Sequence, residues 1–371
     1  MPGSCSDAFP GAFFLTVSKN ICMQQFEIMK LNYDKQTGRT SNRHGIHTRI
    51  SEFGSIDKFA YLDSTKLFIP YYTDLINRLI EEDYIPGLSL KAAPYDFRKA
   101  PYEQMDYIRD LKNLIEKTYE ENGEKKVVLI VNSLGGLMSL IFLRRQSTEW
   151  KDKYIQYVIS VAVGWAGSVK AVEAYVRGFS IGTAEFSRAC SRFSAQPLTE
   201  QPREYAKLPQ ILLLPKSLLR TMPSIIWLFP SSKAWEKTDV LVRLRNKTYT
   251  LNNMEEFFTD LEEPNGWEMY QDIKSFQDEV SEPGVELHCL YATDIQTVAL
   301  VDYSFSFFDY WKKQLNSDGD GTANLQSLQV CEKWKTETNK VKTKSFPGLS
   351  HVEMIKNSEV LDHIIDIIDN N

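Results

Sequence analysis

Apolar residues in the first half of this chain recur with two alternating periods. Over residues 105–118 ("MDYIRDLKNLIEKT") they recur every three to four positions, which predicts a helix. The run at 125–131 ("KKVVLIV") is continuously apolar after its lysines, which predicts a strand buried on both faces. A second helical run covers 134–145, and a second buried strand is expected at 154–164 ("YIQYVISVAVG"). This order predicts a mostly parallel sheet with helices on both faces.

The pattern changes after about residue 175. Residues 176–284 are richer in proline, serine and aromatic residues and follow no regular period. Sheet character returns at 285–293 ("VELHCLYAT"), a Gly/Asp turn follows, and another strand is expected near 340–346. A last helix at 358–369 carries an apolar stripe. The stripe consists of Val360, Leu361, Ile364, Ile365 and Ile368.

These changes divide the chain into a core and an insertion. We expect an α/β core whose first part is residues 31–175 and whose second part is residues 285–371. A cap at 176–284 interrupts the core, and residues 1–30 form an atypical N-terminal segment.

Composition narrows the class of protein. With 371 residues, 43% hydrophobic and 25% charged, the chain has the make-up of an ordinary globular protein. Its net charge of −6 gives no electrostatic reason to expect a nucleic-acid partner. No run approaches the roughly 18 apolar residues that span a bilayer. The opening stretch lacks a positively charged start and Pro10 interrupts it, so we expect a buried or irregular start rather than a signal peptide.

Two features depend on the compartment in which the protein works. A glycosylation sequon begins at Asn246 and is used only if the chain is secreted. The five cysteines are too few for a disulfide scaffold, although one or two bridges fit. They are Cys5, Cys22, Cys190, Cys289 and Cys331.

One serine lies at the bend between a predicted strand and a predicted helix. Gly135 supplies the small residue two places after Ser133 that a nucleophile elbow requires, and Gly136 allows the helix to pack close to the sheet. The amide of Leu134, at the helix N-terminus, is placed to donate to a developing oxyanion. Two places before the serine stands Val131 rather than a small residue, so this turn by itself also fits an ordinary buried crossover.

A serine nucleophile needs a base within hydrogen-bond reach, and the chain has five histidines. His351, in "FPGLSHVEM", follows a predicted strand and precedes the last helix, which suits the chain order Ser, Asp, His. His44 and His47 precede the serine. His288 lies within a predicted strand, and His363 lies beside the apolar stripe of the last helix. We therefore predict His351 as the base.

A carboxylate between the serine and the histidine is needed to orient the imidazole. The turn "SDGDGTANL" at 317–325 contains Asp318 and Asp320. It also fits a plain Asx turn, whereas a calcium loop is not expected because the other loop ligands are absent. Ser133, Asp320 and His351, in this order along the chain, jointly predict a catalytic triad without a metal.

Several longer stretches carry a joint resemblance to one family, in its order, across about residues 31–363. They are "LNYDKQTGRTSN", "AAPYDFRKAP", "VNSLGGLMSLIFLRRQ", "WKDKYIQYVISVAVGWAGSVKA", "PGVELHCLYAT", "DGDGTANLQSLQVCEKW" and "FPGLSHVEM". In these stretches the chain resembles the lecithin–cholesterol acyltransferase family, most closely its lysosomal (group XV) phospholipase A/acyltransferase branch.

The resemblance implies an α/β-hydrolase fold with an inserted cap that touches a phospholipid membrane or lipoprotein surface. It implies an enzyme that takes a fatty acyl group from a glycerophospholipid onto a serine and passes it to water or a lipid alcohol, without a cofactor or metal. Carried over by position, Ser133 is the nucleophile, Asp320 the orienting acid and His351 the base, whereas Asp318 is structural. We expect a monomer with no nucleic-acid partner.

The resemblance also implies features outside the triad. Cys289 and Cys331 match the positions of a family disulfide, and Asn246 falls near a glycosylated stretch. A lysosomal or extracellular location follows from the family alone. Residues 1–30 correspond to a lid remnant, in which Cys22 matches one lid cysteine and its partner is Cys5 or lost.

The chain departs from the family pattern at several positions. Val131 and Asn132 stand where the family has a small residue and a histidine, and Gly164 precedes Trp165 where the family has proline. The family's first strand and Pro-Gly loop, which supply a second oxyanion donor, have no match in residues 1–30. An alternative is therefore a catalytically weak or inactive lipid-binding relative, and another is a truncated product whose longer form carries that loop.

The apolar stretch "LPQILLLPKSLLRTMPSIIWLF" at 208–229 leaves two alternatives open. Its side chains either form a lipid-contacting surface of the cap or fill the core of the cap. For Trp165, lining the acyl channel and a core position are likewise both open.

Overall fold

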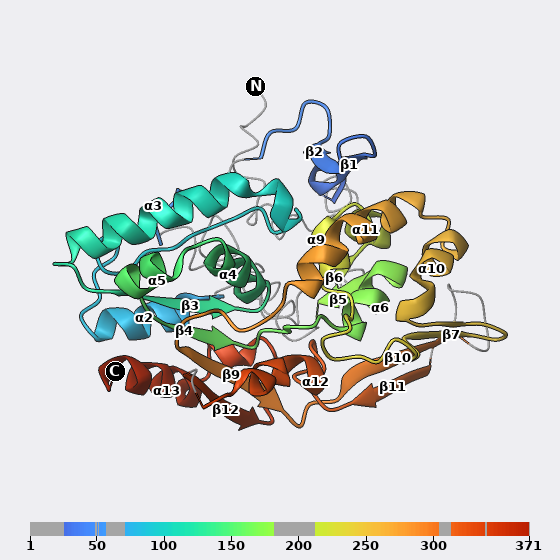
Figure 1. Ribbon diagram of the computed structural model, residues 1–371. Coiled ribbons are helices and arrows are strands. Elements are labelled where there is room, and N and C mark those ends of the chain that lie inside the picture. The colour runs from blue at the N-terminus through green and yellow to red at the C-terminus, as the bar shows by residue number, and fades with distance from the viewer. Residues whose placement is uncertain are drawn as a thin grey trace, which may run out of the picture.

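The computed structural model describes residues 26–48, 50, 52–56, 71–181, 212–303, 313–337 and 340–370. Two four-stranded sheets, each with helices packed against it, organise these residues (Figure 1). Within these ranges no helix combines the length and the apolar character needed to cross a bilayer.

The first sheet is parallel throughout and has the order β12-β9-β4-β3. Its strands are β3 (Val127–Asn132), β4 (Ile155–Val161), β9 (Leu287–Thr293) and β12 (Val341–Pro347). Alternate residues of β4 face opposite sides, since Val158 packs into one hydrophobic cluster and Tyr157 and Ile159 pack into another. Both faces therefore need apolar side chains, which explains the continuously apolar sequence of these strands.

Helices cover both faces of this sheet (Figure 1). On one face lie α3 (Met105–Glu121), α4 (Leu134–Arg144) and α5 (Thr148–Tyr154), and on the other α2 (Thr73–Glu81) and α13 (Ser358–Asp369). The predicted helices at 105–118, 134–145 and 358–369 are thus confirmed, as is the covered parallel sheet. In α13 the stripe differs slightly from the prediction, because Ile367 is buried and Ile368 only partly so.

The second sheet has the order β11-β10-β7-β8. Its strands are β7 (Val242–Leu244), β8 (Thr248–Tyr249), β10 (Thr297–Tyr303) and β11 (Lys313–Ser317). Although β7 comes from the predicted cap and β10 from the predicted second part of the core, they are parallel neighbours. One sheet therefore crosses the predicted boundary at residue 284. The sequence pattern predicted only a Gly/Asp turn after β9 and missed β10, although β10 is seven residues long and largely buried, and β11, which is polar.

Four helices accompany the second sheet and enclose an aromatic core. They are α6 (Val169–Arg177), α9 (Pro223–Trp227), α10 (Met254–Asp260) and α11 (Pro264–Asp278). Phe229 stacks on Phe258 with ring centroids 6.1 Å apart and meets the edge of Tyr175 at 5.5 Å. In the described part of the stretch 208–229, six large apolar side chains are buried, namely Leu218, Leu219, Met222, Ile226, Trp227 and Phe229. For these residues the structure favours the core alternative over a lipid-contacting surface.

Shorter elements lie before, between and after the strands of the two sheets. They are β1 (Leu31–Asp34), β2 (Arg39–Asn42), β5 (Phe179–Ile181), β6 (Leu212–Leu214), α8 (Lys216–Leu219) and α12 (Leu325–Leu328), with 3-10 helices η3 (Pro101–Glu103), η6 (Leu251–Asn253), η7 (Gln329–Trp334) and η8 (Glu353–Ile355).

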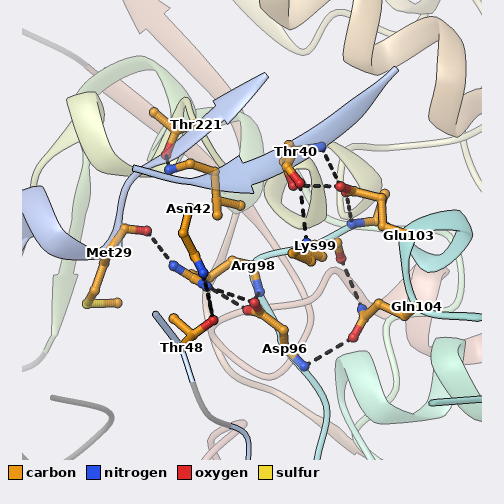
Figure 2. Close-up of polar contacts among 12 residues, drawn as sticks. Met29, Thr40, Asn42, Thr48, Asp96, Arg98, Lys99, Glu103, Gln104 and Thr221 are labelled. Atoms are coloured by element: carbon orange, nitrogen blue, oxygen red, sulfur yellow. Dashed lines mark hydrogen bonds and ion pairs between the residues drawn. The ribbon is translucent and has the colours of Figure 1, made fainter. Parts of the chain in front are cut away.

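A buried arginine fastens the hairpin β1-β2 and the chain before it to the loop that precedes α3 (Figure 2). The guanidinium of Arg98 donates to both carboxylate oxygens of Asp96 at 2.9 and 2.7 Å, to the carbonyl of Met29 at 2.9 Å and to Asn42 Oδ1 at 3.0 Å. Only 3% of its side chain is exposed. Since these partners come from three separate segments, Arg98 joins parts of the chain that share no sheet.

Replacing this arginine should destabilise the fold. Arg98→Met leaves the carboxylate of Asp96, 12% exposed, without its cation, and we expect a loss of about 3–5 kcal/mol in the free energy of unfolding. Arg109→Met is the matched control, because Arg109 is 62% exposed beside Asp106 and its loss should change the free energy of unfolding little. Urea denaturation measures both, and equal losses would contradict the role of Arg98.

Gly136 sets the approach of α4 to the end of β4. A Cβ at this position would lie 2.3 Å from Cγ2 of Val163, so Gly136→Ala should cost about 1–3 kcal/mol of stability. A second change, Val163→Ala, should return part of that loss. Gly135→Ala is the control, since the nearest heavy atom to its Cβ lies 4.0 Å away. In thermal unfolding, Gly136→Ala should be the least stable variant, the double variant with Val163→Ala intermediate, and Gly135→Ala the most stable. A Gly136→Ala protein as stable as the Gly135→Ala control would refute the steric explanation.

Candidate active site

Ser133 occupies the sharp turn between β3 and α4. Its backbone has φ 52° and ψ −126°, a region that residues other than glycine rarely adopt. The amide of Ser133 donates to the carbonyl of Val161 at the end of β4, 3.1 Å away, which fixes the turn to the neighbouring strand. A strained serine held between a strand and a helix is the geometry of a nucleophile elbow.

The turn forms despite the two unusual residues before the serine. Val131 is buried in the core between the sheet and its helices. The side-chain amide of Asn132 donates to the carbonyl of Val161 at 3.0 Å, and its oxygen accepts from the hydroxyls of Tyr71 at 3.2 Å and Tyr72 at 3.4 Å. Both residues therefore have packing or hydrogen-bonding partners, and Asn132 adds a second link between β3 and β4.

The imidazole of His351 lies between Ser133 and Asp320. Its Nε2 is 2.9 Å from the Ser133 hydroxyl oxygen, and its Nδ1 is 2.6 Å from Oδ2 of Asp320. The backbone amide of His351 also donates to the Asp320 carbonyl at 2.8 Å, so the two loops are joined twice. Ser133 lies 218 positions from His351 in the sequence, and Asp320 lies 31 positions from it. Three distant residues thus form one hydrogen-bonded series.

Asp320 is surrounded as an ionised carboxylate requires. It has no exposed surface, and its Oδ1 accepts from the amides of Thr322 at 2.9 Å and Ala323 at 2.6 Å. An ionised carboxylate is an acceptor only, so Nδ1 of His351 must carry the proton that faces it. Nε2 of a neutral imidazole is then free to accept the proton of the Ser133 hydroxyl.

Comparison with known proteins identifies the family. The family model "Lecithin:cholesterol acyltransferase" matches residues 12–358. The chain belongs to the lecithin:cholesterol acyltransferase family. It is 31% identical to a phosphatidylcholine-sterol acyltransferase of Gallus gallus over 325 residues, 87% of this chain and 72% of that protein. It is also 31% identical to a lysosomal phospholipase A and acyltransferase of Homo sapiens over 339 residues, 91% of this chain and 76% of that protein.

The fold of this member of the family agrees with its assignment. A chain of the Tle4-Tli4 complex superposes with a TM-score of 0.50 at 13% identity, covering 82% of this chain and 73% of that chain, which bears on the fold alone. The parallel sheet with helices on both faces and a strand-turn-helix at Ser133 confirms the predicted α/β-hydrolase fold.

The turn that carries Asp320 is held by residues that the sequence did not single out. Asn324 donates to the carbonyl of Val298 at 2.8 Å and accepts from the amide of Val169 at 3.2 Å. Thr297 accepts from the amide of Gly321 at 2.8 Å. Both supporting residues are short polar residues without a periodic signal, although Asn324 lies in a stretch that resembles the family.

Asp318 supports the same turn. Its Oδ1 accepts from the amides of Asp294 and Gly319, each at 2.6 Å, and therefore it shapes the loop. The predicted disulfide between Cys289 and Cys331 is present and joins β9 to η7, just beyond the turn. Cys5, Cys22 and Cys190 lie outside the described residues, as does the predicted lid segment up to residue 25.

Three further predicted residues have described positions. Leu134 is the first residue of α4, so its amide has no acceptor within the helix, and its oxyanion role remains a prediction. Trp165 is 3% exposed and packs edge-on against Trp334 at 4.9 Å, a core position, and contact with an acyl chain stays a prediction. Asn246 is exposed between β7 and β8, and its glycosylation also stays a prediction.

Other histidines have surroundings unlike that of His351. His288 lies in β9 with Nε2 3.0 Å from Glu286, and burial lowers its pKa, which is the setting of a structural residue. His363 is partly buried against Phe346, where burial again lowers its pKa. His44 and His47 are exposed.

The two aspartates of the acid turn offer a matched pair of substitutions. Asp320→Asn places an NH₂ group where Nδ1–H of His351 needs an acceptor. This favours the tautomer with the proton on Nε2, which can no longer accept the proton of Ser133. We expect Ser133 to react about 10⁴ times more slowly with a fluorophosphonate probe. Asp318→Asn keeps the Oδ1 acceptor for both of its amides and should change that rate little. Similar losses in both variants would contradict the assignment of Asp320.

Proposed function

We propose that this protein is a serine-dependent lipid acyl hydrolase and O-acyltransferase that acts on glycerophospholipids through an acyl-enzyme. The observation that carries the proposal is the imidazole of His351, hydrogen-bonded on one side to Ser133 at 2.9 Å and on the other to the buried Asp320 at 2.6 Å. Membership of the lecithin:cholesterol acyltransferase family, whose similar members are named for phospholipase A and acyltransferase activities, supports the choice of substrate.

The geometry accounts for the first half of the reaction. His351 Nε2 takes the proton of Ser133 as the serine oxygen attacks the ester carbonyl carbon. The negative charge on the former carbonyl oxygen lies near the N-terminus of α4, where the amide of Leu134 donates to it. His351 then protonates the departing lysolipid, and the acyl group remains on Ser133.

The second half repeats these steps with another nucleophile. Water or a lipid alcohol gives its proton to His351 and attacks the acyl-serine, and the fatty acid or new ester leaves as Ser133 regains its proton. Asp320 holds the imidazole in orientation through both halves and stabilises its charged form. None of these steps requires a metal or cofactor.

The surroundings of the reaction are part of the proposal. A membrane or lipoprotein surface would supply the glycerophospholipid, and the protein would act there as a monomer, with no nucleic-acid partner. The Cys289–Cys331 disulfide suits an oxidising compartment, consistent with a lysosomal or extracellular location. We propose a core of residues 31–175 and 285–371, a cap at 176–284 that is joined to the core by the sheet containing β7 and β10, and a lid remnant at 1–30.

The alternative is a lipid-binding relative with weak or no activity. The sequence departures that motivate it are the lack of a match for the family's first Pro-Gly loop in residues 1–30, together with Val131 where the family has a small residue. Loss of one oxyanion donor typically costs about 10²–10³ in rate.

Fatty-acid release from phosphatidylcholine vesicles tests the proposal. The unaltered protein should release fatty acid and, with a long-chain alcohol present, form its ester. Ser133→Ala should lower both rates by at least about 10³-fold because no acyl-enzyme forms. Ser358→Ala, an exposed serine at the start of α13, is the control and should be fully active.

The outcomes separate the two candidates. Release that persists undiminished in Ser133→Ala would refute the serine mechanism. Vesicle binding without release, together with no labelling of Ser133 by a fluorophosphonate, would instead support the lipid-binding relative.

A further inference from the structure

We propose that Lys170 is a positioning residue of the triad, whose ammonium both anchors the turn that carries Asp320 and supplies positive charge to the Asp320–His351 pair. This inference rests on the proposed function, because it concerns how the same site is kept reactive. Lys170 belongs to α6, which packs against the second sheet, and it has no place in the reaction steps described above.

The N-terminus of α6 meets the acid turn at consecutive residues. Ser168, the N-cap, donates its hydroxyl to the carbonyl of Thr322. One residue later, the amide of Val169 donates to Oδ1 of Asn324 at 3.2 Å. The start of this helix is therefore fitted to the turn by two contacts before the lysine is reached.

Lys170 makes the third contact. Its Nζ donates to the carbonyl of Gly321 at 2.6 Å, a charge-assisted hydrogen bond. Gly321 follows Asp320 directly and has φ +81°, so this carbonyl lies at the bend of the turn. A shift of this peptide would move the Asp320 carboxylate away from Nδ1 of His351, and small displacements of catalytic groups have large effects on rate.

The ammonium is also a charge beside the triad. Lys170 is partly buried, with Nζ 5.3 Å from the ring centroid of Phe179. Burial lowers the pKa of the Lys170 ammonium, and the Asp320 carboxylate opposes that shift, which places the two charges within each other's field. Arg177, on the same helix, acts in the same direction as burial.

Two carboxylates near the site, Asp318 and Glu353, accept hydrogen bonds from neighbouring loop residues. Asp318 is bound by two backbone amides at the base of the turn, one of them from Asp294. Glu353, two residues after His351, accepts from the amide of Ser350 at 2.8 Å and from its hydroxyl at 2.6 Å. These carboxylates would favour a charged imidazole, whereas Lys170 acts against it.

The sign of the effect follows from electrostatics. A cation near Asp320 favours the ionised carboxylate and disfavours a second positive charge on His351. Loss of Lys170 should therefore move the acid limb of the pH–rate profile upward. A purely structural contact would lower the rate equally at every pH.

The second-order rate constant for fluorophosphonate labelling of Ser133, measured from acidic to neutral pH, tests the inference without a lipid substrate. Lys170→Met should label about tenfold more slowly at neutral pH or worse. Its acid limb should lie higher by about half a pH unit or more. Lys170→Arg keeps the charge and should keep the acid limb of the unaltered protein. Lys344→Met removes an exposed cation on β12 and is the control for net charge.

The outcomes are distinguishable. If the unaltered protein is not labelled and does not hydrolyse esters, the proposed function fails. If it is labelled and Lys170→Met has the same acid limb, the function stands and this inference is overturned, even if the rate is uniformly lower. If Lys170→Met lacks the circular dichroism of the native fold, Lys170→Gln replaces it in the same measurement. In addition, the proton NMR signal of the His351 Nδ1–H in Lys170→Arg should match that of the unaltered protein.

Discussion

A carboxylate without any exposed surface is the constraint on which the rest of the site depends. Burying the charge of Asp320 costs roughly several kcal/mol unless hydrogen bonds and opposite charge replace its hydration. Two backbone amides and an imidazole do so, which requires the turn to fold back on itself. Gly319 permits that, since a Cβ there would lie 2.3 Å from the carbonyl oxygen of Ala323. The conformation of this turn therefore stabilises the buried carboxylate, and the carboxylate fixes the orientation of the imidazole.

The parallel sheet brings the serine and the histidine of the triad together. The serine follows β3, the histidine follows β12, and β4 and β9 lie between them in the sheet. The carboxyl ends of parallel strands meet at one edge, so residues from distant parts of the chain reach a common place. Asn132 and the amide of Ser133 both bind the carbonyl of Val161, so the strained turn is held by the neighbouring strand. This packing stabilises a backbone conformation that the serine alone would avoid.

Helix α6 connects the second sheet with the acid turn. Its body packs against β10, and its first residues bind the turn that carries Asp320. The Cys289–Cys331 disulfide attaches the segment after that turn to β9 of the first sheet. The acid turn is thus anchored from both sheets, which links the packing of the aromatic core around Phe229 to the geometry of the triad.

The sequence by itself determined the elements whose signal is local. Apolar periodicity gave α3, α4, β3, β4, β9 and α13, because a strand or helix buried in the core needs apolar side chains at a fixed spacing. The order of serine, aspartate and histidine in their loops pointed to Ser133, Asp320 and His351 before their distances were known. Tertiary structure alone decided the distances within the triad, that six apolar side chains of 214–229 fill a core, and that β7 pairs with β10. It also decided the partners of Asn132 and Lys170. Those outcomes depend on contacts between segments far apart in the chain, and periodicity reports that a side chain is buried without reporting what buries it.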